Sequence, residues 1–302
     1  MSNEYSFLSG FMQSHNVGRV IAQVDYLKEN GSTASILLKW DRSANHWFSF
    51  DLEWHATRIC FVEVPEPMVL ATGPDGIVSV STMAGSTEEE IDDSLDGPAR
   101  RGPIRDLQLI AGMPYATGMG RQVYRREGAN NWTRQDQGVV LPRGKIELCG
   151  FNSIDGLNES NLYAVGFNGE VWQRKDGQWL NHESPTNLVL HRIKVVREDL
   201  AYACGQMGTL LRSNGSHWEA IKHDAVTDDL WGMEWFNNEL YLACDSGLFR
   251  LDGNDDLIAV DMKLPSKASC RHLHANDGVL WSCGPKNVVW TEDGQTWTEV
   301  TP

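Results

Sequence analysis

The chain has 302 residues, with 26 basic residues against 41 acidic ones, a formal net charge of −15 and a sequence pI near 5.0. Because phosphate binding needs a basic patch, this balance argues against nucleic acid as a direct ligand and favours a basic protein partner. No apolar run is long enough to span a membrane, and residues 1–10, MSNEYSFLSG, lack the basic start and apolar core of a secretory signal. We therefore expect a cytoplasmic protein that does not engage membranes.

One sequence pattern recurs along the chain. Residues 163–179, 202–218 and 281–297 each hold an aromatic residue, two small or apolar residues, a glycine, a short turn, an apolar run, a second polar turn and a tryptophan. The anchor glycine is Gly73, Gly118, Gly166, Gly205 and Gly284, with Asp245 in its place once, at steps of 39 to 48 residues. This period predicts the four-stranded blades of a β-propeller, which must stack because one blade cannot bury its own faces.

The predicted elements follow in chain order. Residues 5–52 predict a divergent first blade and residues 57–83 a second, and five clearer copies follow at about 104–137, 145–183, 190–222, 229–260 and 269–301. In the copy at 190–222 we expect strands over 190–195, 201–204 and 209–212, then an outer strand from Trp218. The anchor glycine and a second glycine after it permit positive φ in a tight turn. The recurring tryptophans are expected to cover the gaps between blades: Trp47, Trp132, Trp179, Trp218 and Trp297.

The predicted fold is therefore all-β, a seven-bladed β-propeller of four-stranded blades that forms a single domain over residues 1–302. A closed set of blades removes exposed sheet edges, which explains why the copies stop at a definite number. A six-bladed propeller with an N-terminal extension is the alternative.

Much of the acidity is local. Residues 84–103 form the longest predicted linker, and within it residues 86–96 read STEEEIDDSLD. One interpretation is a solvated, flexible inter-blade loop. The other is a docking arm for a partner, contributed by Glu88, Glu89, Glu90, Asp92 and Asp93.

The six cysteines are interpreted as reduced, structural thiols. Cys204, Cys244 and Cys283 share one repeat position, which selects a small buried side chain, and equivalent positions on adjacent blades lie too far apart for a disulfide. No Cys-x-x-Cys pair is present, and His272 and His274 lack further ligands at suitable spacing. We predict no metal and no cofactor.

One segment of the last copy, Thr291-Glu292-Asp293-Gly294-Gln295-Thr296-Trp297, resembles the Asp-box hairpin of BNR-type propellers, although it is one residue shorter between Asp and Thr-Trp. The phrase that begins Tyr163-Ala164-Val165-Gly166 is also similar to the repeats of photosystem II assembly-factor-like and WD40/YVTN/BNR-like propellers. The resemblance spans about residues 104–301. It implies a propeller, and it implies that the Asp and Thr side chains of the hairpin satisfy turn amides.

Catalytic motifs are missing from the sequence. There is no Gly-x-Ser-x-Gly, P-loop or His-Glu-x-x-His motif, and no Arg-Ile-Pro segment of the kind found in sialidases. We interpret the protein as non-enzymatic.

Binding residues are sought where loops from every blade converge, on the faces and around the channel. Trp231 and Trp235, which follow Asp228 and Asp229, predict a contact site for a basic partner. Residues near the starts of inner strands are expected to line the channel, namely Arg105, Glu147, Arg192, Arg271 and His272.

The function that these observations favour is a protein-binding propeller, most specifically a bacterial immunity protein that binds and neutralises a cognate toxin and is monomeric on its own. An acidic face suits a nuclease's basic cleft. Two alternatives remain open, an assembly or stability factor for a larger complex and a hydrolase or lyase that acts on a glycan.

Overall fold

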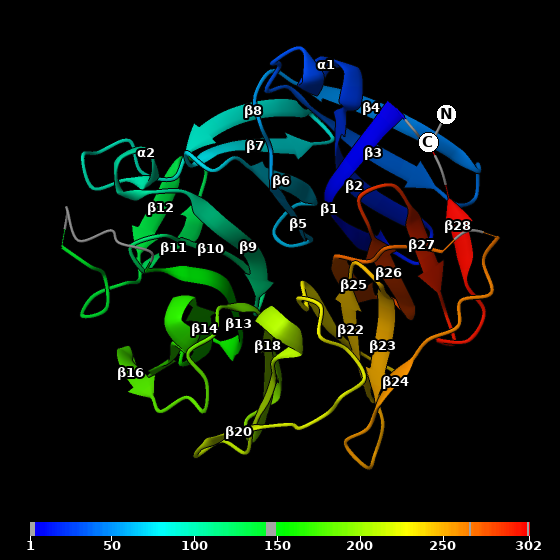
Figure 1. The fold of residues 1–302 in the computed structure, drawn as a ribbon. Coiled ribbons are helices and arrows are strands. Elements are labelled where there is room, and N and C mark those ends of the chain that lie inside the picture. The colour runs from blue at the N-terminus through cyan, green and yellow to red at the C-terminus, as the bar shows by residue number, and fades with distance from the viewer. Residues whose placement is uncertain (1–3, 143–148, 266, 301) are drawn as a thin grey trace. The chain divides into compact units, whose positions relative to one another are not determined.

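The computed structural model describes residues 4–142, 149–265, 267–300 and 302 (Figure 1). The fold is a seven-bladed β-propeller in which every blade is a four-stranded antiparallel sheet. The predicted fold class is confirmed. The six-bladed alternative is wrong, because residues 5–52 contain a complete four-stranded sheet of their own.

The strands follow one another through each sheet in chain order. Blade 1 contains β1 (Tyr5–Ser14), β2 (Val17–Val24), β3 (Ser35–Asp41) and β4 (His46–Leu52), and blade 2 contains β5 (Arg58–Val62), β6 (Met68–Thr72), β7 (Ile77–Thr82) and β8 (Gly85–Glu90). Blade 3 contains β9 (Ile104–Ile110), β10 (Met113–Gly118), β11 (Gln122–Gly128) and β12 (Asn131–Arg134), and blade 4 contains β13 (Phe151–Asn158), β14 (Asn161–Gly166), β15 (Val171–Lys175) and β16 (Gln178–His182).

The remaining three blades have shorter outer strands. Blade 5 contains β17 (Leu190–Arg197), β18 (Leu200–Gly205), β19 (Leu210–Ser213) and β20 (Trp218–Ala220). Blade 6 contains β21 (Gly232–Phe236), β22 (Glu239–Cys244), β23 (Gly247–Leu251) and β24 (Leu257–Ala259), and blade 7 contains β25 (His272–Asn276), β26 (Val279–Cys283), β27 (Val288–Thr291) and β28 (Thr298–Val300). The helices are short: α1 (Asp25–Glu29), α2 (Pro98–Arg101) and the 3-10 turns η2 (Phe167–Gly169) and η3 (Gln206–Gly208).

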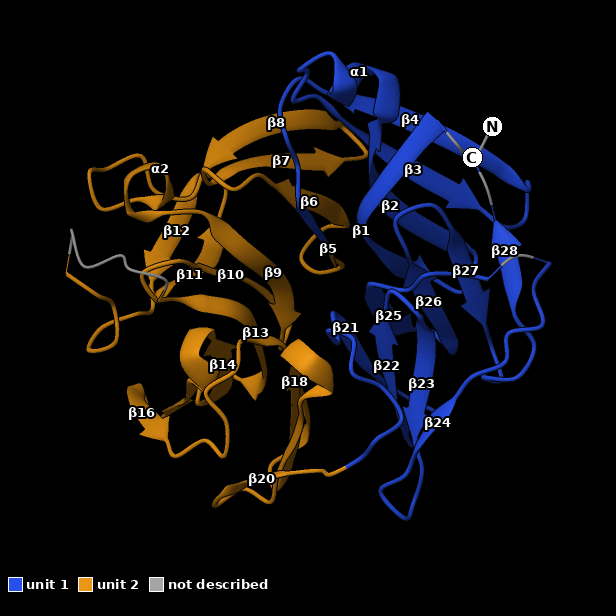
Figure 2. Ribbon diagram, viewed as in Figure 1, with its two compact units in different colours: residues 1–59, 223–302 blue, residues 60–222 orange. Residues whose placement is uncertain are grey.

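The chain divides into two compact units (Figure 2). Each unit has its own hydrophobic clusters. Unit 1 comprises residues 1–59 and 223–302 and holds blades 1, 6 and 7. Unit 2 comprises residues 60–222 and holds blades 2 to 5, apart from the first two residues of β5.

The anchor glycine of the repeat is required by a close approach of two backbone segments. A Cβ atom on Gly166 would lie 1.9 Å from the carbonyl oxygen of Gly150, and one on Gly205 would lie 2.1 Å from that of Val189. Both anchor glycines have extended backbone, with φ of −170° and −171°. Positive φ belongs to the second glycine, as at Gly169 with φ of 68°. The prediction that both glycines supply positive φ therefore holds for the second glycine only.

The repeat tryptophans pack between blades inside each unit, as the sequence predicts. Trp218 of blade 5 is buried and meets Tyr163 of blade 4 edge to face, with 5.9 Å between ring centroids. Trp179 of blade 4 packs in one cluster with Ile110 of blade 3, and its Nε1 donates to the carbonyl oxygen of Gln135 at 2.7 Å. These large apolar surfaces, once buried, bind each blade to its neighbour.

The Asp-box-like hairpin between β27 and β28 satisfies its own backbone amides. Asp293 accepts hydrogen bonds from the backbone N of Gln295 at 2.8 Å and of Thr296 at 2.7 Å, while Thr291 Oγ1 accepts from the N of Gly294 at 2.9 Å. These amide donors stabilise the ionised carboxylate and lower the pKa of Asp293. The segment thus has the structural role that the resemblance implies.

The first and last blades pack against each other within unit 1. Phe7 N donates to the carbonyl oxygen of Pro285 at 3.0 Å, and His15 N donates to Asp277 Oδ2 at 2.7 Å. Trp281 of β26 is fully buried in one cluster with residues of β1, β2 and β3. Segments almost a chain length apart therefore share one core.

The acidic linker predicted over residues 84–103 is largely ordered, and this corrects the sequence analysis. Residues 85–90 form β8, the outer strand of blade 2, and residues 98–101 form α2. The alternation along β8 gives the reason: Glu88 and Glu90 are exposed, whereas Glu89 turns inward. The run of like charges led to the prediction of a loop, although one of its residues, Glu89, has a buried partner.

Candidate interaction surface

An exposed tryptophan stands on the segment that leads into β21. Trp231 is 37% exposed, and its backbone N donates to the carbonyl oxygen of Ala243 at 2.8 Å. The guanidinium of Arg271 lies 5.7 Å from the centre of its ring. Arg271 in turn binds Asp245 in bidentate geometry, with Nε and Nη2 at 2.6 and 2.9 Å from the two carboxylate oxygens. We call Trp231, Arg271 and Asp245 the Trp231 platform.

The repeat itself positions the platform. Asp245 stands where other copies carry the anchor glycine, so its carboxylate rises from the turn between β22 and β23. Arg271 precedes β25, and its backbone N donates to the carbonyl oxygen of Cys283 at 3.2 Å. The adjacent Cys270 N donates to the carbonyl oxygen of Cys244 at 3.1 Å. Backbone bonds on both sides therefore fix the distance between cation and carboxylate.

The electrostatics of the platform suit recognition. The hydrogen bonds that Arg271 donates to the Asp245 carboxylate raise the pKa of Arg271, so the guanidinium stays charged over the ring. Trp and Arg are the residue types that dominate protein-binding hot spots, and the ion pair holds these side chains in place before a partner arrives.

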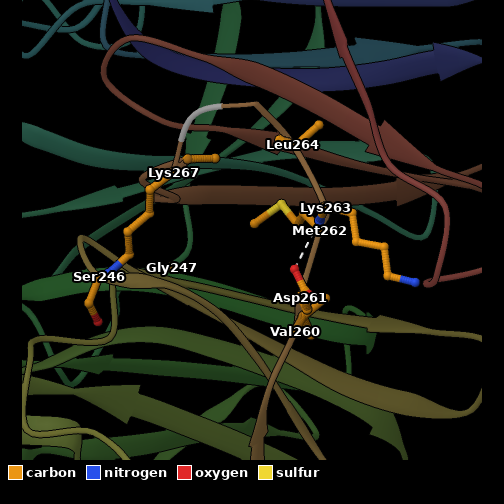
Figure 3. Close-up of a pocket in the computed structure, with 9 residues that line it drawn as sticks. Ser246, Gly247, Val260, Asp261, Met262, Lys263, Leu264 and Lys267 are labelled. Atoms are coloured by element: carbon orange, nitrogen blue, oxygen red, sulfur yellow. Dashed lines mark hydrogen bonds between the residues drawn. The ribbon is translucent and has the colours of Figure 1, made fainter.

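A pocket of about 290 Å³ adjoins the platform along the chain (Figure 3). One wall is the turn Ser246–Gly247, which directly follows Asp245. The other wall is formed by residues 260–264, 267 and 268, between β24 and Arg271, which we call the strap. Figure 3 shows the Asp261 carboxylate bonded to the backbone N of Lys263, at 3.0 Å, so that the strap turns sharply there.

The residues around Trp231 that were predicted to bind a partner differ in their exposure. Asp228 is exposed and Asp229 half-buried on the same linker as Trp231, while Trp235 is half-buried on β21. From the sequence, Trp231 is expected to act with these neighbours and Arg271 to line the channel. The structure joins Trp231 to Arg271 instead, through Asp245, which sequence reasoning missed. The replacement of the anchor glycine at this position was the signal that could have indicated it.

The acidic residues of blade 2 divide by exposure. Glu88, Glu90 and Asp93 are exposed, whereas Asp92 is half-buried with one oxygen 3.3 Å from Arg134 Nη1. Glu89 is only 6% exposed. The expectation that Glu89 contacts a partner does not fit this burial.

Glu89 is instead the centre of a buried network between blades 2 and 3. Its carboxylate accepts from Arg126 Nε at 2.6 Å, Arg126 Nη2 at 3.2 Å, the backbone N of Asn130 at 2.9 Å and Trp132 Nε1 at 3.0 Å. Four donors satisfy the buried charge, which is the condition under which a buried carboxylate is tolerated. Its role here is structural.

Two of the predicted channel residues meet partners inside unit 2. Arg192 Nη1 lies 2.9 Å from Asp106 Oδ1, and Asp106 is fully buried and also accepts from Ser153 Oγ at 2.9 Å. Arg105 is exposed as a residue and donates from Nε to Asn152 Oδ1 at 3.2 Å, and partial loss of water around its guanidinium lowers its pKa. Sequence reasoning missed Asp106, whose single negative charge gave no pattern.

Of the two remaining candidates, His272 and Glu147, only His272 lies in the part of the chain that the structure describes. His272 is half-buried on β25, and Glu147 lies outside the described residues. Across residues 4–142, 149–265 and 267–300, no group of three or more His, Cys, Asp or Glu side chains could hold a metal ion. Within the same ranges, no helix is long and apolar enough to cross a membrane.

Comparison with solved structures supports the fold. The WD40 β-propeller domain of Doa1 matches with a TM-score of 0.72 and 10% identity, over 96% of this chain and 94% of that chain. YCF48 bound to D1 peptide matches with a TM-score of 0.67 and 14% identity, over 95% and 91% of the two chains. At these identities the likeness shows that the chain is a propeller repeat protein and no more.

No family model matches the chain. Among curated proteins, the immune protein Tsi7 of Pseudomonas aeruginosa is 36% identical over 303 residues, which cover 99% of this chain and 98% of the relative. The aligned region therefore includes every blade and both units. The chain therefore belongs to the family of the immune protein Tsi7.

Proposed function

We propose that this protein confers immunity by binding a cognate protein toxin through the Trp231 platform, without catalysing a reaction. The full-length identity to an immune protein carries the proposal. The propeller fold supports it, because propellers present binding residues on the loops that connect their strands, and Trp231 lies on such a connection.

We further propose that the toxin is basic and is met in the cytoplasm by a monomer of this chain. A net charge of −15 favours the encounter with a basic protein and disfavours nucleic acid or an anionic membrane surface as the ligand. Six free cysteines, five of them buried, are compatible with a reducing compartment.

Immunity is tested first in cells. We expect deletion of this gene to be toxic in a strain that carries the cognate toxin gene, for which the neighbouring genes are the first candidates, and we expect re-expression of this chain to restore growth. Protection that persists without a stable complex between the two purified proteins would contradict neutralisation by binding.

The platform is tested by Trp231→Ala. Truncating a central hot-spot residue costs about 2 kcal/mol or more, which weakens the dissociation constant by roughly thirtyfold. Biolayer interferometry with immobilised toxin, inactivated by mutation, measures the affinity. Phe48→Ala is the matched control, because Phe48 is also an exposed aromatic residue of unit 1 under a cation, Lys39, 5.2 Å from its ring. Equal losses for the two variants would remove the platform from the interface.

A further inference from the structure

We infer that helix α1 binds an arginine or lysine side chain of the toxin, which lies over the ring of Tyr26 and pairs with the carboxylate of Glu29. The inference rests on the proposed function and adds a second contact, with its chemistry, to the Trp231 platform. Its grounds are the place of α1 in the repeat, the exposure and spacing of these two side chains, and the contacts that link α1 to the platform.

Helix α1 occupies a connection that is short in the other two blades of unit 1. Residues 25–34, which contain α1 (Figure 1), join β2 to β3, whereas residues 245–246 make the corresponding connection in blade 6 and residues 284–287 make it in blade 7. None of the residues of α1 is buried. Since the other two blades close the same hairpin without a helix, and α1 adds nothing to a hydrophobic core, contact with a partner explains its sequence better than packing does.

The spacing of the side chains places an aromatic ring and a carboxylate on one face of the helix. Tyr26 is 70% exposed, and Glu29 is exposed three residues later. Residues that are three apart are neighbours on a helix surface. Leu27, which is 42% exposed, adds apolar surface next to the ring, along which the alkyl stem of a long cationic side chain can lie.

This ring and this carboxylate are not engaged by a cation of the chain itself. Among the residues that the structure describes, none places a cation over the Tyr26 ring or forms an ion pair with Glu29. Lys28 shares a helix face with Asp25 instead, and hydrogen bonds from Lys286 and Ser6, together with the charge of Lys28, lower the pKa of Asp25. The exposed ring and its neighbouring carboxylate are therefore available to a cation of the partner.

The chain uses the same combination of groups to hold its own arginines. In each case a guanidinium lies over an aromatic ring and forms an ion pair with a carboxylate: Arg271 with Trp231 and Asp245, Arg42 with Trp290 and Glu292, Arg121 with Trp172 and Glu170, and Arg134 with Tyr124 and Asp136. In α1 the ring and the carboxylate come from this chain and the cation comes from the partner. The toxin proposed above is basic, so arginine or lysine on its surface has the required charge.

Hydrogen bonds hold α1 in place before a partner arrives. The Asp25 carboxylate accepts from Ser6 Oγ at 2.6 Å and from Lys286 Nζ, which ties the first turn of α1 to blades 1 and 7. At the other end, Asn30 Nδ2 donates to the carbonyl oxygen of Tyr26 at 2.7 Å. Because the backbone of α1 is already fixed, binding a cation there costs little conformational entropy.

Direct contacts connect α1 to the Trp231 platform. Lys286, the partner of Asp25, precedes Asn287, whose Oδ1 accepts from the backbone N of Ser269 at 3.2 Å. Ser269 stands two residues before Arg271 of the platform. An interface of standard size engages about 20–30 residues on each side, far more than the platform supplies. An interface that contains the platform therefore extends onto neighbouring connections, of which α1 is one.

Two substitutions at Tyr26 test the role of the ring in binding assays with the inactivated toxin. Tyr26→Phe keeps the ring and is expected to retain the affinity. Tyr26→Leu keeps apolar area but removes the ring, and it is expected to weaken the dissociation constant by about fivefold. Phe48→Leu makes a matched change at another exposed aromatic residue of unit 1 and should leave the affinity nearly unchanged.

A charge reversal tests the carboxylate and identifies the partner residue. Glu29→Lys is expected to weaken the dissociation constant by about tenfold, because an attractive contact becomes repulsive. Glu198→Lys makes the same charge change on the exposed β17–β18 turn and is the control for the general loss of negative charge. One Arg→Glu or Lys→Glu substitution on the toxin should restore most of the affinity lost by Glu29→Lys. Unchanged thermal unfolding midpoints would show that the variants remain folded.

The outcomes separate the two proposals. If the unmodified protein fails to bind the toxin, the proposed function fails. If it binds, and Tyr26→Leu and Glu29→Lys lose no more affinity than their controls, the inference alone is overturned. Equal losses in Tyr26→Phe and Tyr26→Leu, or the lack of any compensating basic residue on the toxin, would also overturn it. A dimer of the protein by itself, measured by light scattering and abolished by Glu29→Lys, would assign α1 to a second copy of the chain instead.

Discussion

The cysteine thiols show how burial sets the chemistry of single residues in this protein. Cys204, Cys244 and Cys283 occupy equivalent positions on β18, β22 and β26, each buried just before or at the turn that follows the strand. Burial raises the pKa of Cys60 and Cys204 to about 12 and that of Cys270 to about 11. Loss of water disfavours the thiolate, and this effect outweighs the opposing attraction of Arg126 at Cys60 and of Arg192 at Cys204.

We expect native protein to react slowly with Ellman's reagent at pH 8. A thiol with a pKa near 12 is only about one part in 10⁴ thiolate at that pH, and thiolate is the reacting form. Cys149 is only half-buried, so it should react first even though burial and Glu170 raise its pKa as well. Denaturant should release all six thiols. Rapid reaction of several thiols in the native protein would contradict this picture.

Between elements, the stability of unit 2 depends on a buried ion pair. Glu89 of β8 and Arg126 of β11 join blades 2 and 3 and are both nearly inaccessible to water. Such a pair is costly to desolvate, yet it is much more costly to break, because one charge is then left alone in the interior. The pair fixes the position of one blade against the next.

Arg126→Met is therefore expected to lower the free energy of unfolding by about 3–5 kcal/mol. Arg126→Met combined with Glu89→Leu should recover much of that loss, since no uncompensated charge remains. Arg197→Met, which breaks the exposed pair with Asp199, is the control and should cost less than about 1 kcal/mol. Urea unfolding measures all three, and a large loss in the double variant would show that the pair itself is indispensable.

For the whole molecule, the net charge of −15 affects the association rate constant of a partner more than its dissociation rate constant. The exposed carboxylates of blade 2, among them Glu88, Glu90 and Asp93, contribute to this field without needing to touch the toxin. Fields of this kind act over about one Debye length, which is near 10 Å at 0.1 M salt.

We expect the association rate constant with a basic toxin to fall as salt rises from about 50 mM to 500 mM, while the dissociation rate constant changes little. Replacing Glu88, Glu90 and Asp93 together by lysine should lower the association rate constant by about tenfold at low salt and converge with the unmodified protein at high salt. Stopped-flow fluorescence measures both rates. A dissociation rate that rises sharply in the triple variant would instead place these residues in the interface.

The sequence by itself determined the repeat and therefore the blades. The copies contain strands with apolar residues at every second position, and most have an anchor glycine and a closing tryptophan. These features recur because every blade must pack against its neighbours in the same way. The strand limits predicted around Trp218 and the structural role of Asp293 followed from such local patterns. The divergent first blade could also be predicted, from residues 5–52.

Only the tertiary structure decided which individual charged residues form ion pairs with distant residues. Glu89 is indistinguishable from Glu88 and Glu90 in the sequence, and it becomes structural because Arg126, 37 residues away, meets it inside unit 2. Trp231 acquires Arg271 and Asp245 as neighbours by the same kind of long-range contact. A local pattern reports the backbone period and which face of a strand is apolar, whereas an ion pair depends on which distant segments the packing of blades brings together.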